Sequence, residues 1–100
     1  MTGTTRSSAG LDPRRKRLLF RSWHRGTREM DLLLGRFADH AILDMDTAAL
    51  DAYEALIEAP DDDLFAWITE RSPVPVDYSS GVVGTIVAFH KAHPGAGRTE

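Results

Sequence analysis

The chain has 100 residues, of which 42% are hydrophobic and 27% are charged, so it suits one folded domain and is too apolar for an intrinsically disordered protein. It contains no cysteine, which excludes a disulfide framework, a thiolate metal site and a cysteine nucleophile. The formal net charge of −3 hides an asymmetry. Residues 1–29 carry eight Arg or Lys against two acids, a net +6, whereas residues 30–100 carry four against thirteen, a net −9. This asymmetry predicts an interaction through the N-terminal part of the chain.

Hydrophobic periodicity and capping residues predict five helices and no strand. In chain order their approximate ranges are residues 12–25, 27–39, 46–59, 61–72 and 80–93. Residues 81–89 are rich in Val and would also suit a β-strand, but one strand without a partner is not stable, so a helix is favoured. We therefore predict an all-α protein, a compact five-helix bundle over residues 11–93, with disordered tails over residues 1–10 and 94–100.

Polar residues mark where these helices begin. Asp12 followed by Pro13 is typical of an N-cap and a first helical residue, and Asp46 or the next residue is predicted to cap the third helix. The fifth helix is predicted to be capped within Ser79–Gly81. The run Asp61–Asp63 places carboxylates in the first turn of the fourth helix, where they stabilise it, and the spacing of an EF-hand calcium loop is absent.

The sequence shows no pattern typical of an enzyme or of a metal site. No nucleophile–base pair and no phosphate-binding glycine loop are present, so we predict that the protein is not an enzyme. His90 and His93 lie on one predicted helix, but without cysteines or an H-E-x-x-H spacing they are interpreted as surface residues. No apolar run reaches the roughly 18–20 residues that a membrane span needs, and no secretory signal is recognisable.

The first helix divides into an apolar side and a basic side. Its core-facing residues are predicted to be Leu18, Leu19, Ser22 and Trp23, and its basic residues are Arg14, Arg17, Arg21 and His24. Phe20 lies beside the basic residues, which predicts contact with a partner, since aromatic and Arg side chains anchor interfaces. A solvated face with Phe20 partly covered by a loop is an equal alternative. Nucleic acid is a rival partner, but the acidic remainder of the chain would repel phosphates.

The segment that joins the first two helices is predicted to be a docking surface. Gly26 lets the chain adopt a positive φ and reverse direction. Arg25 and Glu29 carry the charges favoured at the helix ends where they lie, so local electrostatics alone would explain them. Glu29 and Leu32, however, lie off the core-facing side of the second helix, so both are predicted to be exposed. Gly35, in the middle of that helix, indicates close approach by another backbone.

Two segments of the chain resemble one known family. The run KRLLFRSWHRGTREMD over residues 16–31 contains the R-G-x-x-E pattern as Arg25, Gly26 and Glu29, and D-x-L-F-x-W occupies residues 62–67. Both resemble the small succinate dehydrogenase FAD assembly factors of bacteria and mitochondria, and the resemblance covers residues 12–93. His24 stands where many relatives have a second Arg, which makes the charge at this position depend on pH.

The resemblance implies a five-helix bundle that binds the flavoprotein subunit of succinate dehydrogenase and promotes covalent attachment of FAD to a histidine of that subunit. Fumarate reductase is a second candidate client. The expected mechanism is that of a chaperone: Glu29 is a fixed anionic contact, no residue is catalytic, and FAD is handled on the partner and not bound stably by the isolated chain. The residues predicted to contact the partner are Arg17, Phe20, Arg21, His24, Arg25, Gly26, Arg28, Glu29, Asp31 and Leu32.

Three further expectations accompany this hypothesis. The free protein is predicted to be a monomer that neither binds nucleic acid nor inserts into a membrane. Its expected location is the bacterial cytoplasm, or the mitochondrial matrix if the source is a eukaryote. The alternative function is that of a nucleic-acid-binding or antitoxin-like regulatory protein that uses the basic side of the first helix.

Overall fold

The computed structural model describes residues 10–76, 78 and 80–93, without the side chain of Ser80. These residues form five α-helices, one 3₁₀-helix and no strand, which confirms the all-α prediction and excludes the strand alternative for residues 81–89. The helices are α1 (Pro13–Trp23), α2 (Arg28–Ala41), η1 (Ile42–Asp44), α3 (Thr47–Leu56), α4 (Asp61–Ile68) and α5 (Ser80–Ala92). The predicted tails lie, apart from Gly10, outside the described residues, as does Ser79 of the predicted cap of α5.

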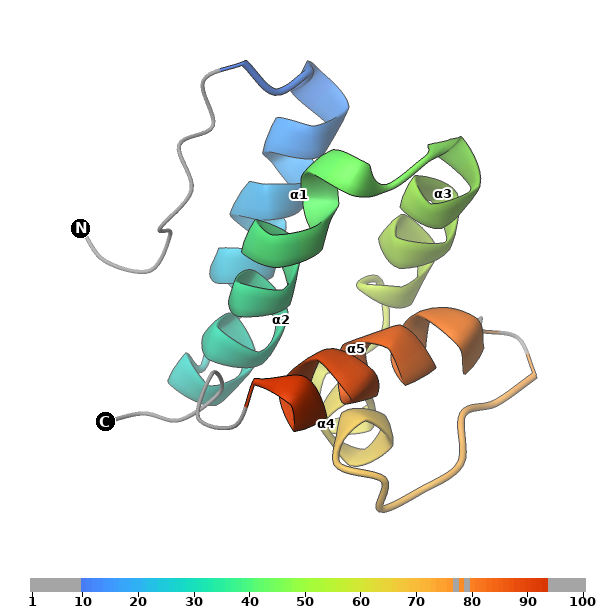
Figure 1. Cartoon of the computed structure of the whole chain (residues 1–100). Helices are drawn as coiled ribbons and strands as arrows, with labels where there is room; N and C mark the ends of the chain where they lie inside the picture. Colours follow the sequence, from blue (N-terminus) through green and yellow to red (C-terminus); the bar gives the residue numbers. More distant parts are fainter. Residues whose placement is uncertain (1–9, 77, 79, 94–100) are drawn as a thin grey trace.

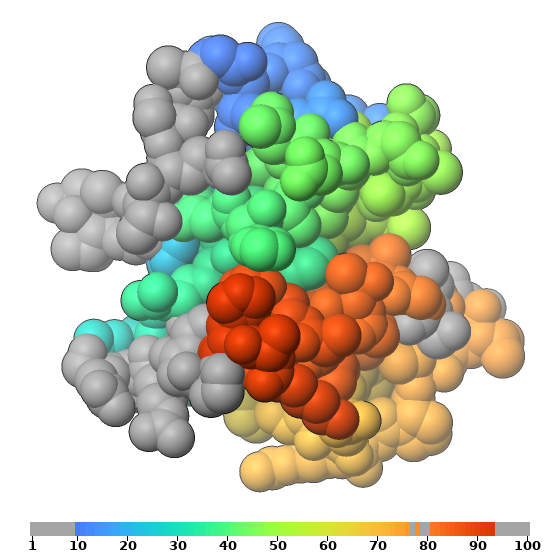
Figure 2. Space-filling model, in the orientation of Figure 1, coloured from blue at the N-terminus to red at the C-terminus, as the bar shows by residue number. Residues whose placement is uncertain are grey.

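The helices pack into a globule whose principal extents are 36 × 33 × 25 Å. Helices α1 and α2 form an antiparallel pair, and the C-terminal part of α5 lies against α2 while α5 also packs on α3 and α4 (Figure 1). In the space-filling view, the side chains of α5 meet those of α2 without a gap (Figure 2). None of the helices formed by the described residues is long and apolar enough to cross a lipid bilayer.

Side-chain caps define the starts of the first three α-helices, as the sequence predicts for the first and the third. The Asp12 carboxylate accepts a hydrogen bond from the Arg15 amide at 3.3 Å, and the Thr27 hydroxyl accepts one from the Met30 amide at 3.3 Å. Of the two candidates before α3, Asp46 is the cap, since its carboxylate accepts from the backbone N–H three residues later at 2.8 Å. These caps satisfy amide groups that have no partner within the helix.

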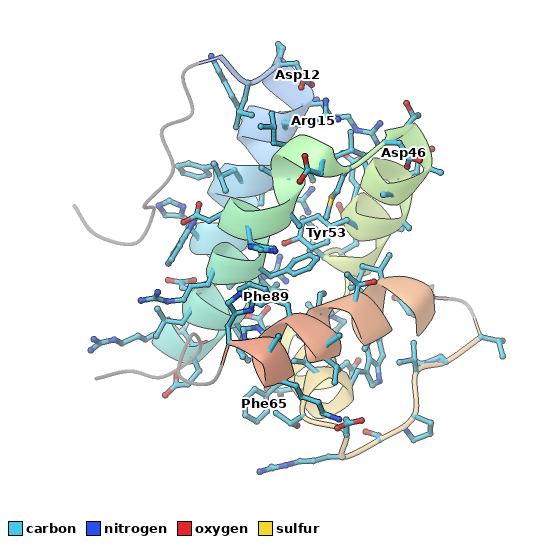
Figure 3. All side chains as sticks on the ribbon, viewed as in Figure 1. Asp12, Arg15, Asp46, Tyr53, Phe65 and Phe89 are labelled. Carbon is cyan, nitrogen blue, oxygen red and sulfur yellow. The ribbon has the colours of Figure 1, made fainter. Side chains whose placement is uncertain are left out.

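The short helix η1 is not predicted by the hydrophobic pattern of the sequence. It is held by the Arg15 guanidinium, whose Nε donates to the Ile42 carbonyl at 3.0 Å and whose Nη2 donates to the Met45 carbonyl. Figure 3 shows Arg15 between the start of α1 and this connection. Ile42 itself is completely buried, so the connection between α2 and α3 adds an apolar side chain to the core.

The core-facing side predicted for α1 is buried in full. Leu18, Leu19 and Trp23 join the apolar core, and the Ser22 hydroxyl is satisfied by the Leu18 carbonyl at 2.7 Å and by the Tyr53 hydroxyl at 2.5 Å. Tyr53 points from α3 toward α1 and α2 (Figure 3), and its burial raises the pKa of its phenol to about 12.

Gly35 is approached by a side chain of the same molecule and not by another backbone, so that prediction was wrong. A Cβ at this position would lie only 2.2 Å from Cδ2 of Trp23. The indole is fixed there because its Nε1–H donates to the Asp39 carboxylate, one turn further along α2, at 3.3 Å. The glycine therefore allows α1 and α2 to pack closely around the Trp23 ring.

Two of the helical glycines, Gly35 and Gly84, predict opposite effects of the same substitution. We expect Gly35→Ala to lower the free energy of unfolding by about 1–3 kcal/mol, because the added methyl group overlaps the Trp23 ring. Gly84→Ala in α5 should raise it by about 0.5–1 kcal/mol, because its Cβ would meet no atom within 4 Å and alanine favours the helix. Urea unfolding followed by circular dichroism measures both. Equal stabilities for the two variants would contradict the packing described for Trp23.

Candidate functional site

The turn between α1 and α2 has a backbone conformation that requires a glycine. Gly26 has a φ of +115°, as predicted, in the region that L-residues rarely adopt. A Cβ there would contact nothing within 4 Å, so the requirement is conformational and not steric. Thr27 then caps α2, and the chain reverses within four residues. The backbone at Gly26 is consequently exposed and open to a partner.

Arg25, which the sequence places among the partner contacts on an exposed turn, instead points into the molecule. Its guanidinium donates to the Asp61 carboxylate from Nε at 3.0 Å and from Nη2 at 2.8 Å, and to the carbonyls of Ile57 at 2.9 Å and Ala59 at 3.4 Å. Only 11% of the Arg25 side chain is exposed. The residue therefore ties the α1–α2 turn to the connection between α3 and α4. Its neighbours are more than thirty residues away in sequence, so a helical wheel could not reveal them.

Asp31 and Leu32 also make contacts within the molecule that support the turn. The Asp31 carboxylate accepts a hydrogen bond from the Arg25 backbone N–H at 2.6 Å, across the turn. Leu32 is half-buried and packs against the core, so the prediction that it is unburied was wrong. The sequence predicts that both residues contact a partner. The contacts observed for both residues instead help to fix the shape of the turn.

Glu29 and Arg28 begin α2 on the outer side of the same turn, and both are exposed as expected. No ion pair or side-chain hydrogen bond with another described residue engages either of them. Their charged groups are thus available to a second molecule.

Phe20 and His24 form a stacked pair on the exposed face of α1. Phe20 is 62% exposed, which excludes cover by a loop from the described residues. Its ring lies 3.9 Å from that of His24, centroid to centroid, at an interplanar angle of 14°. Nδ1 of His24 donates to the Phe20 carbonyl at 2.7 Å, since a carbonyl oxygen can only accept. Arg17 shares this face because it precedes Phe20 by three residues.

We call the exposed residues around the turn the outer surface. It consists of Arg17, Phe20, His24, Gly26, Arg28 and Glu29. These are six of the ten residues predicted from the sequence, and all six are exposed, either along α1 or at the α1–α2 turn and the start of α2.

Two other basic residues of α1, Arg14 and Arg21, form ion pairs with acids of α3 and of the connection that follows it. Arg14 binds Asp51 at 2.6 Å and Glu54 at 2.9 Å, and Arg21 binds Glu58 at 2.9 Å. Arg21, a predicted partner contact, therefore has a partner within the molecule. The basic side of α1 is divided: part of it neutralises the acids of α3, and only part of it faces outward. This pairing reduces the positive surface that a nucleic acid would need.

The acids and histidines elsewhere have mostly structural roles. Asp61 begins α4, as predicted, and is engaged by Arg25. His90 is half-buried, contrary to its interpretation as a surface residue, and its Nε2 donates to the Leu33 carbonyl at 2.9 Å. Burial lowers the pKa of its imidazole. The described residues contain no group of three or more His, Cys, Asp or Glu side chains that could hold a metal ion.

Comparison with known proteins gives one consistent result. The model of the family described as "Flavinator of succinate dehydrogenase" matches residues 16–90. The chain is 36% identical over 84 residues to the mitochondrial succinate dehydrogenase assembly factor 2 of Dictyostelium discoideum, which covers 84% of this chain and 60% of that protein. It is likewise 36% identical over 77 residues to the FAD assembly factor SdhE of Acetobacter pasteurianus, covering 77% and 71%.

Mitochondrial relatives are longer than the matched region. The assembly factor 2 of Mycosarcoma maydis is 36% identical over 74 residues, which make up 74% of this chain but 31% of that protein. The chain thus spans about a third of the length of the Mycosarcoma protein and about three fifths of the length of the Dictyostelium protein.

The different burial of two acid–arginine pairs predicts different contributions to stability. We expect Asp61→Asn to lower the free energy of unfolding by about 1.5–3 kcal/mol, because it weakens the hydrogen bonds of a largely buried guanidinium. The matched substitution Glu58→Gln, in the exposed pair with Arg21, should change it by less than about 1 kcal/mol. Urea unfolding of both variants tests this. A larger effect for Glu58→Gln would show that Arg25 does not hold the turn.

Proposed function

The chain belongs to the flavinator family of succinate dehydrogenase assembly factors, and from this membership we propose that it binds the flavoprotein subunit through the outer surface and promotes covalent attachment of FAD there. The observation that carries the choice of surface is the exposed Phe20–His24 stack beside the positive-φ Gly26 and the unengaged Glu29. Aromatic rings held rigidly at a surface are typical anchors of protein interfaces.

Each part of the outer surface suits a different contact. The Phe20 ring offers apolar area with little loss of entropy on binding, since His24 already restricts it. Arg17 and Arg28 are positive groups without partners among the described residues, so they favour an acidic region of the flavoprotein subunit. Gly26 lets a backbone approach where any side chain would stand in the way. Glu29 then supplies one carboxylate to a donor or a cation of the subunit.

The proposed mechanism is that of a chaperone without a reaction of its own. By binding one conformation of the flavoprotein subunit, the protein raises the population in which FAD and the acceptor histidine are adjacent. The outer surface offers Glu29 as a fixed anion, and the residues that support it are engaged in hydrogen bonds inside the molecule. The covalent bond then forms within the subunit.

We place FAD on the flavoprotein subunit and not on this chain. A pyrophosphate group is favoured at a helix N-terminus that lacks acidic groups. The first turns of α2 and α4 instead carry carboxylates, at Glu29 and Asp31 in α2 and at Asp61–Asp63 in α4. A dinucleotide is therefore disfavoured at the starts of α2 and α4. The site of action would be the compartment in which the subunit folds, the cytoplasm of a bacterium or the mitochondrial matrix.

Glu29 is tested by a substitution that has a matched control. We expect Glu29→Ala to lower covalent flavin on the co-expressed flavoprotein subunit about tenfold, because an interface anchor contributes about 1–2 kcal/mol. Asp63→Ala is the control, since it removes another exposed carboxylate from the first turn of a helix. Flavin fluorescence of the subunit in a denaturing gel measures the product. Equal labelling with Glu29→Ala and wild type would contradict the proposed surface.

The aromatic anchor is tested in the same assay. Phe20→Ala should reduce covalent flavin and weaken co-purification with the subunit by a similar factor, while the free energy of unfolding stays within about 0.5 kcal/mol of wild type. Leu43→Ala, at an apolar residue that is 55% exposed on η1, serves as the control and should leave both readouts unchanged. If the two variants behave alike, Phe20 is a solvated side chain and not an anchor.

A further inference from the structure

Two Phe–His pairs in the molecule have the same local geometry. In each, a histidine lies four residues after a phenylalanine on a helix, and its ring stacks on the phenyl ring: His24 on Phe20 at 3.9 Å and 14°, and His93 on Phe89 at 4.5 Å and 27°. In each, the histidine Nδ1 donates to the carbonyl of that phenylalanine, at 2.7 and 2.9 Å. The neutral imidazole then keeps its lone pair on Nε2. Histidines that bind metal ions commonly donate their other ring nitrogen in this way.

A third histidine lies opposite the second pair. His40, near the end of α2, has its ring centroid 5.2 Å from that of His93 at an interplanar angle of 59°, and 5.0 Å from that of Phe89. Figure 3 shows Phe89 where α5 meets α2. Two imidazoles that share a tetrahedral zinc ion, at Zn–N distances of about 2.0–2.1 Å, have ring centroids roughly 5 Å apart. The observed separation therefore matches that of two ligands of one ion.

We propose that His40 and His93 bind a divalent transition-metal ion, such as zinc, between α2 and the end of α5, with Nε2 of His93 as one ligand. Imidazole nitrogens suit zinc, copper and nickel and bind calcium or magnesium poorly. Because the described residues add no third protein ligand, water completes the coordination, and the ion exchanges readily.

The surroundings favour the ion in two further respects. The Phe89 ring contacts both imidazoles and packs edge-on against Phe37 of the core, so it limits the approach of water from that side. An ion held by His40 of α2 and by His93, the residue after α5, would also stabilise the contact between these helices. Binding must weaken in acid, because only neutral imidazoles coordinate a metal.

The repeated Phe–His geometry supplies a matched control for the experiment. Untagged protein is titrated with zinc chloride at neutral pH, by calorimetry and by the shift in unfolding temperature. Wild type and His24→Ala should both bind one equivalent, since His24 has the same carbonyl bond and the same stack but no second histidine facing it. His93→Ala and His40→Phe should weaken binding roughly tenfold or more. His40→Phe keeps a ring against Phe89, so its fold is preserved.

Three outcomes would overturn the proposal. They are the absence of zinc binding by wild type up to about 1 mM, binding that survives unchanged in His93→Ala or in His40→Phe, and a loss in His24→Ala as large as in those variants. The last would mean that zinc binds to exposed histidines without a defined site.

Discussion

The contact between Arg25 and Asp61, in which two guanidinium N–H groups donate to Oδ1 of the carboxylate, is the interaction on which the arrangement of the molecule most depends. It joins the α1–α2 turn to the start of α4, and the same guanidinium also donates to two carbonyl groups of the connection between α3 and α4. Of the ion pairs formed by the described residues, it is the most buried, with 11% and 25% of the two side chains exposed. Exposed pairs contribute little to stability, whereas an unsatisfied buried guanidinium costs several kcal/mol. The turn therefore cannot move independently of α4.

The charge asymmetry of the sequence has a largely internal explanation. Three of the arginines before residue 30 bind acids that belong to the negative part of the chain, in α3, in α4 and in the connection between them: Arg14, Arg21 and Arg25. The buried hydroxyls of Ser22 and Tyr53 also bind each other and fix α1 against α3. The positive charge that still faces outward is a small surplus around Phe20. A segment that resembles a basic arm in the sequence is, in the folded protein, mostly the positive side of an intramolecular contact.

The elements that the sequence predicts well are those decided by local chemistry. Helix starts at Asp12 and Asp46 depend on bonds to an amide three residues away, and the positive φ of Gly26 depends on one residue. The predictions for the direction of the Arg25 side chain and for the neighbour of Gly35 were wrong. Both features depend on groups that only the tertiary fold brings near. In the candidate site, exposure was predicted correctly for residues on the outer helix faces and incorrectly for those that support the turn.

The R-G-x-x-E pattern can accordingly be divided into three physical tasks. Arg25 is a buried support, Gly26 supplies a backbone conformation, and Glu29 is an exposed charge. Glu29 and the exposed backbone of Gly26 are available to a partner, and Arg25 holds both in place, since Asp31 on the same helix as Glu29 also accepts the Arg25 N–H. A surface fixed in this way before binding loses little entropy when a partner docks. A short motif can therefore combine one contact with the scaffold that orients it, and loss of the support would weaken docking although the contact residue is intact.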